Sequence, residues 1–464
     1  MFNKKTIFLA TAGMLALAAC SKTGNLPDEP NVQPAEEVSF GAYLSRGTTK
    51  AGLAGTELTT SGGTDNLQTE GFGVFGYYTD GELYTDSAQP NFMYNQKVTF
   101  ADPLWTYSPV KYWPNEFGTQ ASADEVDRLT FFAYAPWVDV AAASGSLKST
   151  VYLDEAERTT GITGLSRATA AGDPLVKYVA SFNPTQSVDL CWGVAKEAFT
   201  ASVTTEFANE IAVGYPYVDV AKPLTGSKIN FDFKHALSSL NVQIDTDVDV
   251  ASHNDSELES NTKIYVRSVT FEGFSMKGAL NLNSNATTGP NWMDIAGVER
   301  LSSTPVTVYD GRRNGKEGVA NAADANEKPQ GLNEVLIQDE PYDGTPKAGV
   351  LNTPVNLFSG AELTSPIFVI PNGETLKVTI VYDVETKDPK LSTFLSDGVT
   401  LGSTVENTIT KTIKTTSDEA FVMECGKRYV IRLHLGLTSV KFDANVAPWE
   451  TGAEEDIDTP VNAS

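Results

Sequence analysis

Cysteine and histidine are both scarce in this chain, which has 3 of each among its 464 residues. The histidines, His235, His253 and His434, stand in no zinc-type spacing such as HExxH. The sequence also has no phosphate-binding loop, Gly-x-Ser-x-Gly motif or dinucleotide fingerprint. We therefore assign the histidines structural roles and predict no metal, no cofactor and no enzymatic activity.

Basic residues are in the minority, because 34 Lys+Arg stand against 59 Asp+Glu and give a formal net charge of −25. This balance excludes nucleic acid and anionic membrane surfaces as partners, and it predicts a soluble surface that repels other copies of itself. The chain is nevertheless 41% hydrophobic, which excludes disorder throughout its length.

Long apolar runs are missing after residue 20, so no later segment approaches the ~18 apolar residues of a membrane span. The first twenty residues carry two lysines and then an apolar stretch from 7 to 19, which predicts a signal peptide over 1–20. Its end, Leu-Ala-Ala-Cys20, resembles the bacterial lipobox. That resemblance implies acylation of Cys20 by the lipoprotein export machinery, with attachment to the cell outer membrane. We favour this interpretation over an ordinary signal with an incidental cysteine.

The two remaining cysteines, Cys191 and Cys425, lie in different halves of an exported chain. A disulfide between them and a pair of unpaired buried thiols are both consistent with the sequence. We favour the unpaired thiols, since spacing alone gives no distance between them.

Helical periodicity is rare, and short alternating segments with Gly/Pro turns take its place. The apolar residues at 229, 231 and 233, at 376 to 384 and at 429 to 435 recur at every second position, which is typical of strands with one buried face. Many such strands predict an all-β chain built of sandwiches.

We divide the chain into four parts by composition. They are the signal peptide 1–20, a polar tether and leading strand over 21–46, an N-terminal sandwich over 47–225 and a C-terminal sandwich over 226–464. Residues 302–357 are rich in Asn, Asp, Gly and Pro and predict a surface excursion.

Several segments resemble the fimbrillin family, the pilins of Bacteroidales type V pili, and the likeness covers nearly all of the exported chain. The segments that carry it are 107–114 (YSPVKYWP), 129–136 (LTFFAYAP), 231–240 (FDFKHALSSL) and 427–435 (KRYVIRLHL), the last running on to VAPW at 446–449. The resemblance implies two transthyretin-like β-sandwich domains in tandem, lipoprotein export, cleavage by an Arg-specific protease and assembly with other pilin subunits by strand exchange. The length of the 302–357 excursion departs from the pattern of a plain stalk subunit.

Two segments of the chain carry nearly the same alternating series, as strand exchange requires. The leading series is Val38, Phe40, Ala42, Leu44, and the trailing series, in a donor strand near 437–449, is Val440, Phe442, Ala444, Val446. Since strand side chains alternate between faces, either segment suits the same groove without a change of register. The leading series ends just before Arg46-Gly47, so cleavage there would free it. The alternative is that both are ordinary edge strands.

Two further features concern carbohydrate. Asp86-Ser87-Ala88 resembles a short O-glycosylation signal of Bacteroidales, which makes Ser87 a candidate attachment site. The aromatic residues Trp105, Tyr107, Tyr112 and Trp113 suit either sugar stacking or a sandwich core, and we favour the core.

Taken together, the sequence predicts a surface-exposed stalk pilin that forms a homopolymer and joins accessory pilins. The alternatives are a pilus tip adhesin with a host or bacterial surface ligand, an anchor subunit, and a monomeric glycan-binding lipoprotein.

Overall fold

The computed structural model describes residues 36–44, 66–114, 127–139, 152–154, 160–181, 187–202, 208–222, 228–246, 262–294, 304–310, 335–336, 355–356, 367–394, 400–415, 418–435 and 440–448. Strand is the main secondary structure of these residues and helix is almost absent, so the predicted all-β class is confirmed. Among them, the single helix is α1 (Asn66–Glu70), and no helix is long and apolar enough to cross a membrane.

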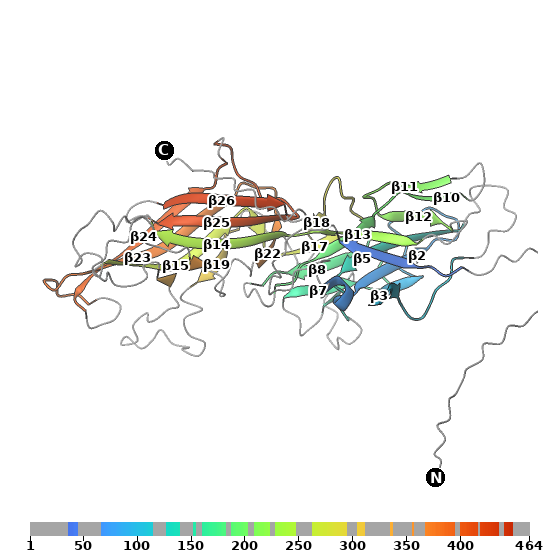
Figure 1. The fold of residues 1–464 in the computed structure, drawn as a ribbon, viewed down its shortest axis with the longest axis horizontal. Helices are drawn as coiled ribbons and strands as arrows, with labels where there is room; N and C mark the ends of the chain where they lie inside the picture. Colours follow the sequence, from blue (N-terminus) through green and yellow to red (C-terminus); the bar gives the residue numbers. More distant parts are fainter. Residues whose placement is uncertain are drawn as a thin grey trace, which may run out of the picture.

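Two pairs of sheets lie one after the other along an elongated molecule (Figure 1). The first pair contains an 8-stranded and a 5-stranded sheet. The larger sheet runs in the order β1 (Phe40–Leu44), β13 (Ile229–His235), β9 (Cys191–Ala195), β5 (Arg128–Ala135), β2 (Phe72–Tyr78), β3 (Met93–Ala101), β4 (Leu104–Thr106), with β12 (Tyr217–Ala221) paired to β5. The smaller sheet runs β18 (Asn291–Met293), β17 (Lys277–Asn281), β8 (Leu175–Val179), β7 (Gly161–Ser166), β6 (Tyr152–Asp154).

The second pair contains a 6-stranded and a 5-stranded sheet. The first of these runs β16 (Phe274–Ser275), β22 (Ile367–Pro371), β14 (Ser238–Thr246), β25 (Lys427–Leu435), β26 (Val440–Pro448), with β21 (Val355–Asn356) on β14. The other runs β19 (Val306–Asp310), β15 (Thr262–Glu272), β23 (Lys377–Lys387), β24 (Gly402–Thr412), with β20 (Val335–Leu336) on β15. A separate hairpin joins β10 (Phe199–Ser202) to β11 (Ala208–Ile211).

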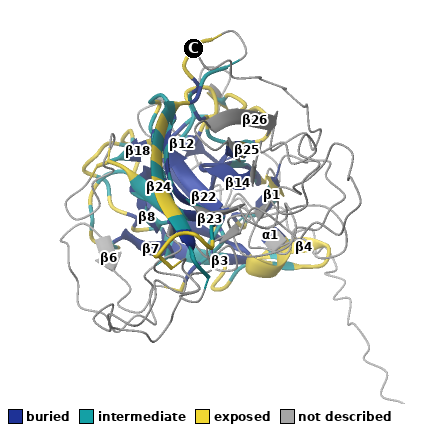
Figure 2. Cartoon of the chain, turned by 90° about the vertical axis from the view of Figure 1, so that its left-hand side faces the viewer, coloured by how far each residue is buried: buried dark blue, intermediate teal, exposed yellow. Residues whose placement is uncertain are grey.

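The alternating segments of the sequence do form strands with one face in a core. In β13 the buried residues Ile229, Phe231 and Phe233 alternate with half-buried ones, and in β23 Val378, Ile380 and Tyr382 are all fully buried. Figure 2 shows the buried residues at the centre of the sheets, with β24 outside them as a strip of exposed and half-buried positions. The period-two pattern therefore correctly identified which residues point inward.

The 8-stranded sheet is buried on both faces. Along β5, Phe131 and Ala133 belong to one apolar cluster while Phe132 and Tyr134 belong to another on the opposite face. The second cluster fills the space between this sheet and the smaller one. The first cluster lies on the other face, and the inward side chains of β1 belong to it. A strand that is buried on both faces has a nearly continuous run of apolar residues in the sequence, and LTFFAYA at 129–135 is such a run.

Two strand placements connect the halves of the chain. Strand β13 lies in the first sheet pair and passes through only residues 236 and 237 into β14 of the second pair. Strands β17 and β18 return to the first pair, where β17 pairs with β8 in an antiparallel register. The excursion at 302–357 contributes β19, β20 and β21, each paired with a long strand of the second pair.

Candidate functional site: the leading strand and its groove

The leading strand β1 lies at the edge of the 8-stranded sheet and pairs in parallel with β13. The register joins Phe40 to Ile229, Ala42 to Phe231 and Leu44 to Phe233. The Ile229 N–H extends the ladder by donating to the Ser39 carbonyl at 2.9 Å. In the described part of the chain, β13 is the one strand that pairs with β1, so the opposite edge of β1 has no strand partner there.

The residues just before β1 are fixed by a different segment. The Val38 N–H donates to the Lys111 carbonyl and the Trp113 N–H to the Glu36 carbonyl, both at 2.9 Å. In addition, the Tyr107 hydroxyl donates to the Val38 carbonyl at 2.6 Å. The leading segment is therefore held on one side by residues 107–113 and on the other by β13.

The predicted inward series of the leading strand is largely buried. Val38, Phe40 and Leu44 are 0%, 2% and 6% exposed, and Ala42 is half-buried against the same cluster. The ring of Phe40 meets those of Tyr107, Phe131 and Phe231, with centroids 5.4, 5.7 and 6.2 Å away. The outward residue Tyr43 is 41% exposed, as alternation requires.

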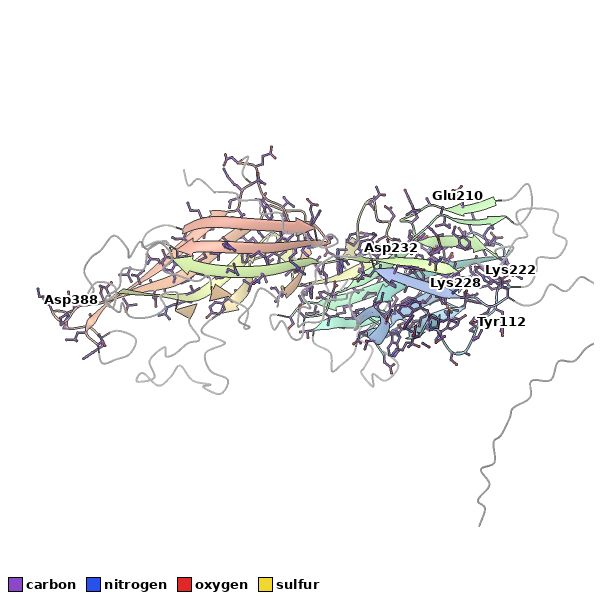
Figure 3. The ribbon with its side chains drawn as sticks, in the orientation of Figure 1. Tyr112, Glu210, Lys222, Lys228, Asp232 and Asp388 are labelled. Carbon is purple, nitrogen blue, oxygen red and sulfur yellow. The ribbon has the colours of Figure 1, made fainter. Side chains whose placement is uncertain are left out.

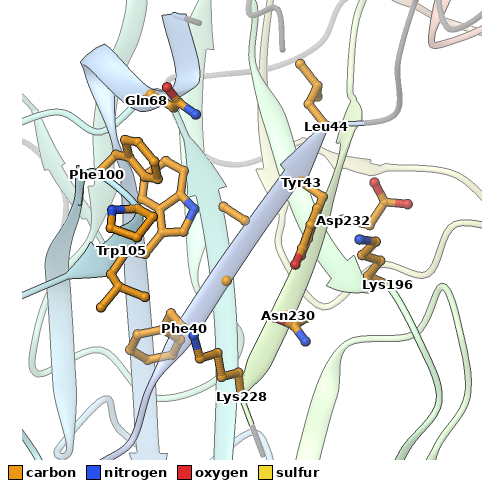
Figure 4. Close-up of a pocket in the computed structure, with 14 residues that line it drawn as sticks. Phe40, Tyr43, Leu44, Gln68, Phe100, Trp105, Lys196, Lys228, Asn230 and Asp232 are labelled. Carbon is orange, nitrogen blue, oxygen red and sulfur yellow. The ribbon is translucent and has the colours of Figure 1, made fainter. Parts of the chain in front are cut away.

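A groove of about 570 Å³ runs along β1 and is lined by residues from both sides of the strand. Figure 4 shows the aromatic rings of Phe100 and Trp105 on one side of the strand, and Lys196 with Asp232 on the other. The Lys196 ammonium lies over the ring of Tyr43, 3.0 Å from its centroid. One wall of the groove is thus apolar and the other is charged, and β1 lies between them.

Tyr107 contacts the backbone of the leading segment through its titratable hydroxyl. Burial raises the pKa of Tyr107 to about 12, so the phenol keeps its proton near neutral pH and remains a donor to Val38. The sequence had placed Tyr107 in an aromatic cluster with Trp105, Tyr112 and Trp113. The hydrogen bond from its hydroxyl to the leading segment could not be predicted, because the spacing of residues in the sequence does not show which backbone carbonyl a hydroxyl will contact.

That aromatic cluster is chiefly part of the core. Trp113 is 2% exposed and belongs to the cluster beneath β1, and Trp105 and Tyr107 pack against it. Tyr112 is the exception at 52% exposed, and Figure 3 shows it at the end of the molecule opposite Asp388.

The trailing strand β26 lies at the edge of the 6-stranded sheet and pairs in antiparallel register with β25. The four predicted donor positions are paired as Val440 with Leu435, Phe442 with Leu433, Ala444 with Ile431 and Val446 with Tyr429. Among the described strands, β25 is its one partner.

The other predicted positions have different outcomes. Cys20, Arg46 and Gly47 lie outside the described residues. Ser87 is exposed in a turn where its hydroxyl lies 2.8 Å from that of Thr85. No disulfide joins Cys191 and Cys425; Cys191 is buried, as we expect, whereas Cys425 is only half-buried.

The fold and this site define a class of protein: an all-β chain whose leading strand completes a core from the edge of a sheet. No family model matches the chain. Over 466 residues it is 24% identical to the fimbrium subunit Fim1C of Phocaeicola vulgatus, with 97% of each chain covered. This match along the whole chain confirms the resemblance to the fimbrillin family.

Solved structures of low sequence identity also align with most of the chain. A fimbrial protein from Bacteroides vulgatus is 19% identical with a TM-score of 0.49, and the alignment covers 89% of this chain and 99% of that one. The tip fimbrial protein Mfa3 from Porphyromonas gingivalis, with a C-terminal truncation, is 8% identical with a TM-score of 0.28 and coverage of 82% and 96%.

Proposed function

We propose that this chain is a non-enzymatic structural subunit of a surface pilus, and that it polymerises by exchange of its leading strand for the trailing strand of another copy. The chain-wide likeness to a fimbrium subunit supports the pilus role. The observation that carries the exchange mechanism is the placement of β1, which is buried in a core, paired along one edge with β13 and ends two residues before Arg46.

The energy of exchange comes from the slot that β1 fills. Burial of Val38, Phe40 and Leu44 at ~1.5 to 3 kcal/mol each contributes roughly 5 to 9 kcal/mol before the ladder hydrogen bonds to β13 are counted. Loss of β1 would expose this apolar surface, and a strand with a similar inward series would recover most of the energy. An emptied slot would therefore strongly favour capture of a second strand.

The trailing segment fits the register of the slot with one adjustment. If Phe442 replaces Phe40, then Asp443 takes the position of Gly41, where a Cβ atom would lie 2.1 Å from Oδ1 of Asn230. Because that atom is on the side chain of a half-buried residue, Asn230 can turn away, at the cost of its 2.6 Å hydrogen bond to Glu197. The exchange thus requires a side-chain rotation and no backbone movement at Asn230.

Export and processing complete the proposal. Acylation at Cys20 would hold the precursor at the outer membrane, and an Arg-specific protease would cut between Arg46 and Gly47. The mature subunit would then join a homopolymer and accessory pilins on the cell surface.

We also propose two transthyretin-like sandwich units, with the boundary near residue 225 kept as a prediction. The two sheet pairs support the division. In such a division, residues 229–235 and 277–293 would count with the N-terminal unit, since their strands pair there.

The alternative roles within a pilus are a tip adhesin and a membrane anchor. An anchor would keep its acylated Cys20 and would need no donor strand. The edge position of β26, paired with β25 in the described residues, favours a subunit that donates one. A glycan-binding lipoprotein is less favoured, because Trp105, Tyr107 and Trp113 pack in or against the core.

The test begins with the N-terminus of pilus material sheared from cells, which we expect to be Gly47. An acylated Cys20 in that material would contradict the stalk role. Purified precursor treated with an Arg-specific protease should form SDS-resistant ladders, whereas an Arg46→Ala chain should stay monomeric and an Arg158→Ala control should polymerise. A chain truncated after Leu437 should be cleaved without forming ladders.

A further inference from the structure

Three side chains with metal-binding atoms meet inside the fold at a place that the pilus role does not use. Asp189, Cys191 and His235 each offer one ligand atom, and these atoms all lie within 4.8 Å of one another. Cys191 begins β9, His235 ends β13, and the two are register partners in the antiparallel ladder. We propose that this cluster is a binding site for a divalent transition-metal ion of the zinc type.

The distances suit one small ion. The Cys191 sulfur lies 3.5 Å from Nδ1 of His235, and the Asp189 carboxylate Oδ2 lies 2.8 Å from the same nitrogen. Ligands held at about 2.0 to 2.3 Å around a tetrahedral zinc ion are roughly 3.3 to 3.8 Å apart. The sulfur and the nitrogen already have this separation, and the carboxylate needs to retreat by only some tenths of an ångström.

Burial separates this cluster from the many carboxylates on the surface. Asp189 and Cys191 are 0% exposed and His235 is 6% exposed. Burying a carboxylate away from water costs free energy unless a positive charge lies beside it. A divalent ion supplies more positive charge than the single proton that the carboxylate and the imidazole share. Thiolate, imidazole and carboxylate together form a ligand set that zinc accepts in proteins.

Binding would replace protons with the ion. The Cys191 thiol releases its proton to solvent and becomes the thiolate ligand. Nδ1 of His235 binds the ion without a proton, so a neutral imidazole keeps its one proton on Nε2 and an imidazolium releases its second proton to solvent. Affinity should therefore fall as the pH decreases. Three protein ligands leave one position of a tetrahedral ion for a further donor.

The place of the cluster gives the ion a structural effect. His235 is the last residue of β13, and the next residue, Ala236, donates its N–H to the Leu190 carbonyl at 2.8 Å. An ion here would fasten β9 to β13 at the point where the chain leaves the first sheet pair for the second. We expect it to stabilise the fold without contacting β1 or its groove.

The test uses the full exported chain without an affinity tag, unfolded with a reductant and refolded with Co²⁺ or Zn²⁺ so that ions reach the buried site. After excess metal is removed, wild type should retain a stoichiometric amount and should melt at a higher temperature than the apo chain. Bound Co²⁺ should show a thiolate charge-transfer band and the visible bands of tetrahedral cobalt. A refolded wild-type chain that retains no metal, or whose cobalt spectrum lacks the thiolate band, would overturn the proposal.

The second cysteine of the described residues, Cys425, offers a matched control. Cys191→Ser should weaken metal binding by more than the roughly 10- to 100-fold that loss of an outer partner costs. Cys425→Ser should leave the cobalt spectrum and the melting shift unchanged. If Cys191→Ser does not fold, Cys425→Ser still decides the matter, because loss of the thiolate band in that variant would assign the metal to the other thiol. Neither result depends on polymerisation, so the experiments can contradict the proposed metal site without contradicting the proposed pilus function, and the reverse.

Discussion

At the scale of single residues, Phe40 is the side chain that joins the leading strand to the aromatic rings of the core. Its ring lies 6.2 Å or less, centroid to centroid, from three others, and it is 2% exposed. Its neighbour Tyr43 lies on the same strand but points outward. Substitutions at these two residues therefore separate what the buried face of β1 contributes to the free energy of unfolding from what its exposed face contributes.

We expect Phe40→Ala to lower the free energy of unfolding of the uncleaved precursor by about 3 to 5 kcal/mol, since a large buried ring leaves a cavity. The matched change Tyr43→Ala should cost less than about 1 kcal/mol, which is the worth of an exposed cation–π contact. Urea denaturation followed by tryptophan fluorescence measures both. Equal losses would mean that β1 is not a core strand.

Tyr107 gives a pH dependence with a definite sign. Its pKa is raised from 10.0 to about 12 by burial, so the folded state favours the neutral phenol. The stabilisation is complete below pH 10 and is lost as the pH rises through about 12. We expect the urea midpoint of the precursor to fall over this interval, and to fall less steeply in Tyr107→Phe. A midpoint that rises with pH in this interval would contradict the assignment.

At the scale of elements, the alternation of apolar residues predicted the strands but not their partners. Ile229, Phe231 and Phe233 were recognised as a buried face, and so were Val38, Phe40 and Leu44. Their parallel pairing could not be predicted, because strands separated by nearly 190 residues leave no mark of their register in the sequence. For the same reason, the sequence could not predict that β17 pairs with β8 or that Asp189 lies beside His235. The helix α1 was missed as well, since it follows a Gly/Thr-rich stretch.

The slot should accept the trailing sequence in place of the leading one. We expect a precursor with Ser39→Lys, Gly41→Asp, Tyr43→Asn and Leu44→Val to fold, because its inward series then matches that of residues 440–446. Circular dichroism and a cooperative urea transition measure this. Phe40→Asp, which places a charge in the core, is the control that should not fold cooperatively. Failure of the first variant alone would show that the two segments are not interchangeable.

Within that set, Gly41→Asp should carry most of the cost, about 1 to 3 kcal/mol, because its Cβ meets Asn230. Asn230→Ala should recover most of this loss, and a double-mutant cycle in urea gives the coupling between the two positions. Additive losses would mean that the side chain of Asn230 is not the obstacle.

At the scale of the whole molecule, charge opposes assembly. Residues 1–46 contain four Lys/Arg and four Asp/Glu, so their removal leaves the formal net charge at −25. Each subunit thus brings the same excess of negative charge to the polymer. Subunits that repel one another at long range still associate when the contact itself is apolar, but they do so more slowly.

We therefore expect polymerisation of protease-treated chain to accelerate as ionic strength rises from about 0.01 to 0.15 M, since the Debye length shrinks from about 30 to 8 Å over that range. Light scattering measures the rate, and the uncleaved Arg46→Ala chain controls for salt-induced aggregation. A rate that falls with added salt would indicate that attraction between opposite charges guides the encounter.

The passage from β13 to β14 through two residues has a mechanical consequence. If a neighbour's segment occupied the place of β1, it would lie beside β13, while the subunit's own trailing end leaves from β26, next to β25 and β14. Tension along a fibre would then run from one ladder to the next through a single covalently continuous stretch of backbone. The load would act on each ladder as shear along its length, the direction in which many hydrogen bonds must break at once.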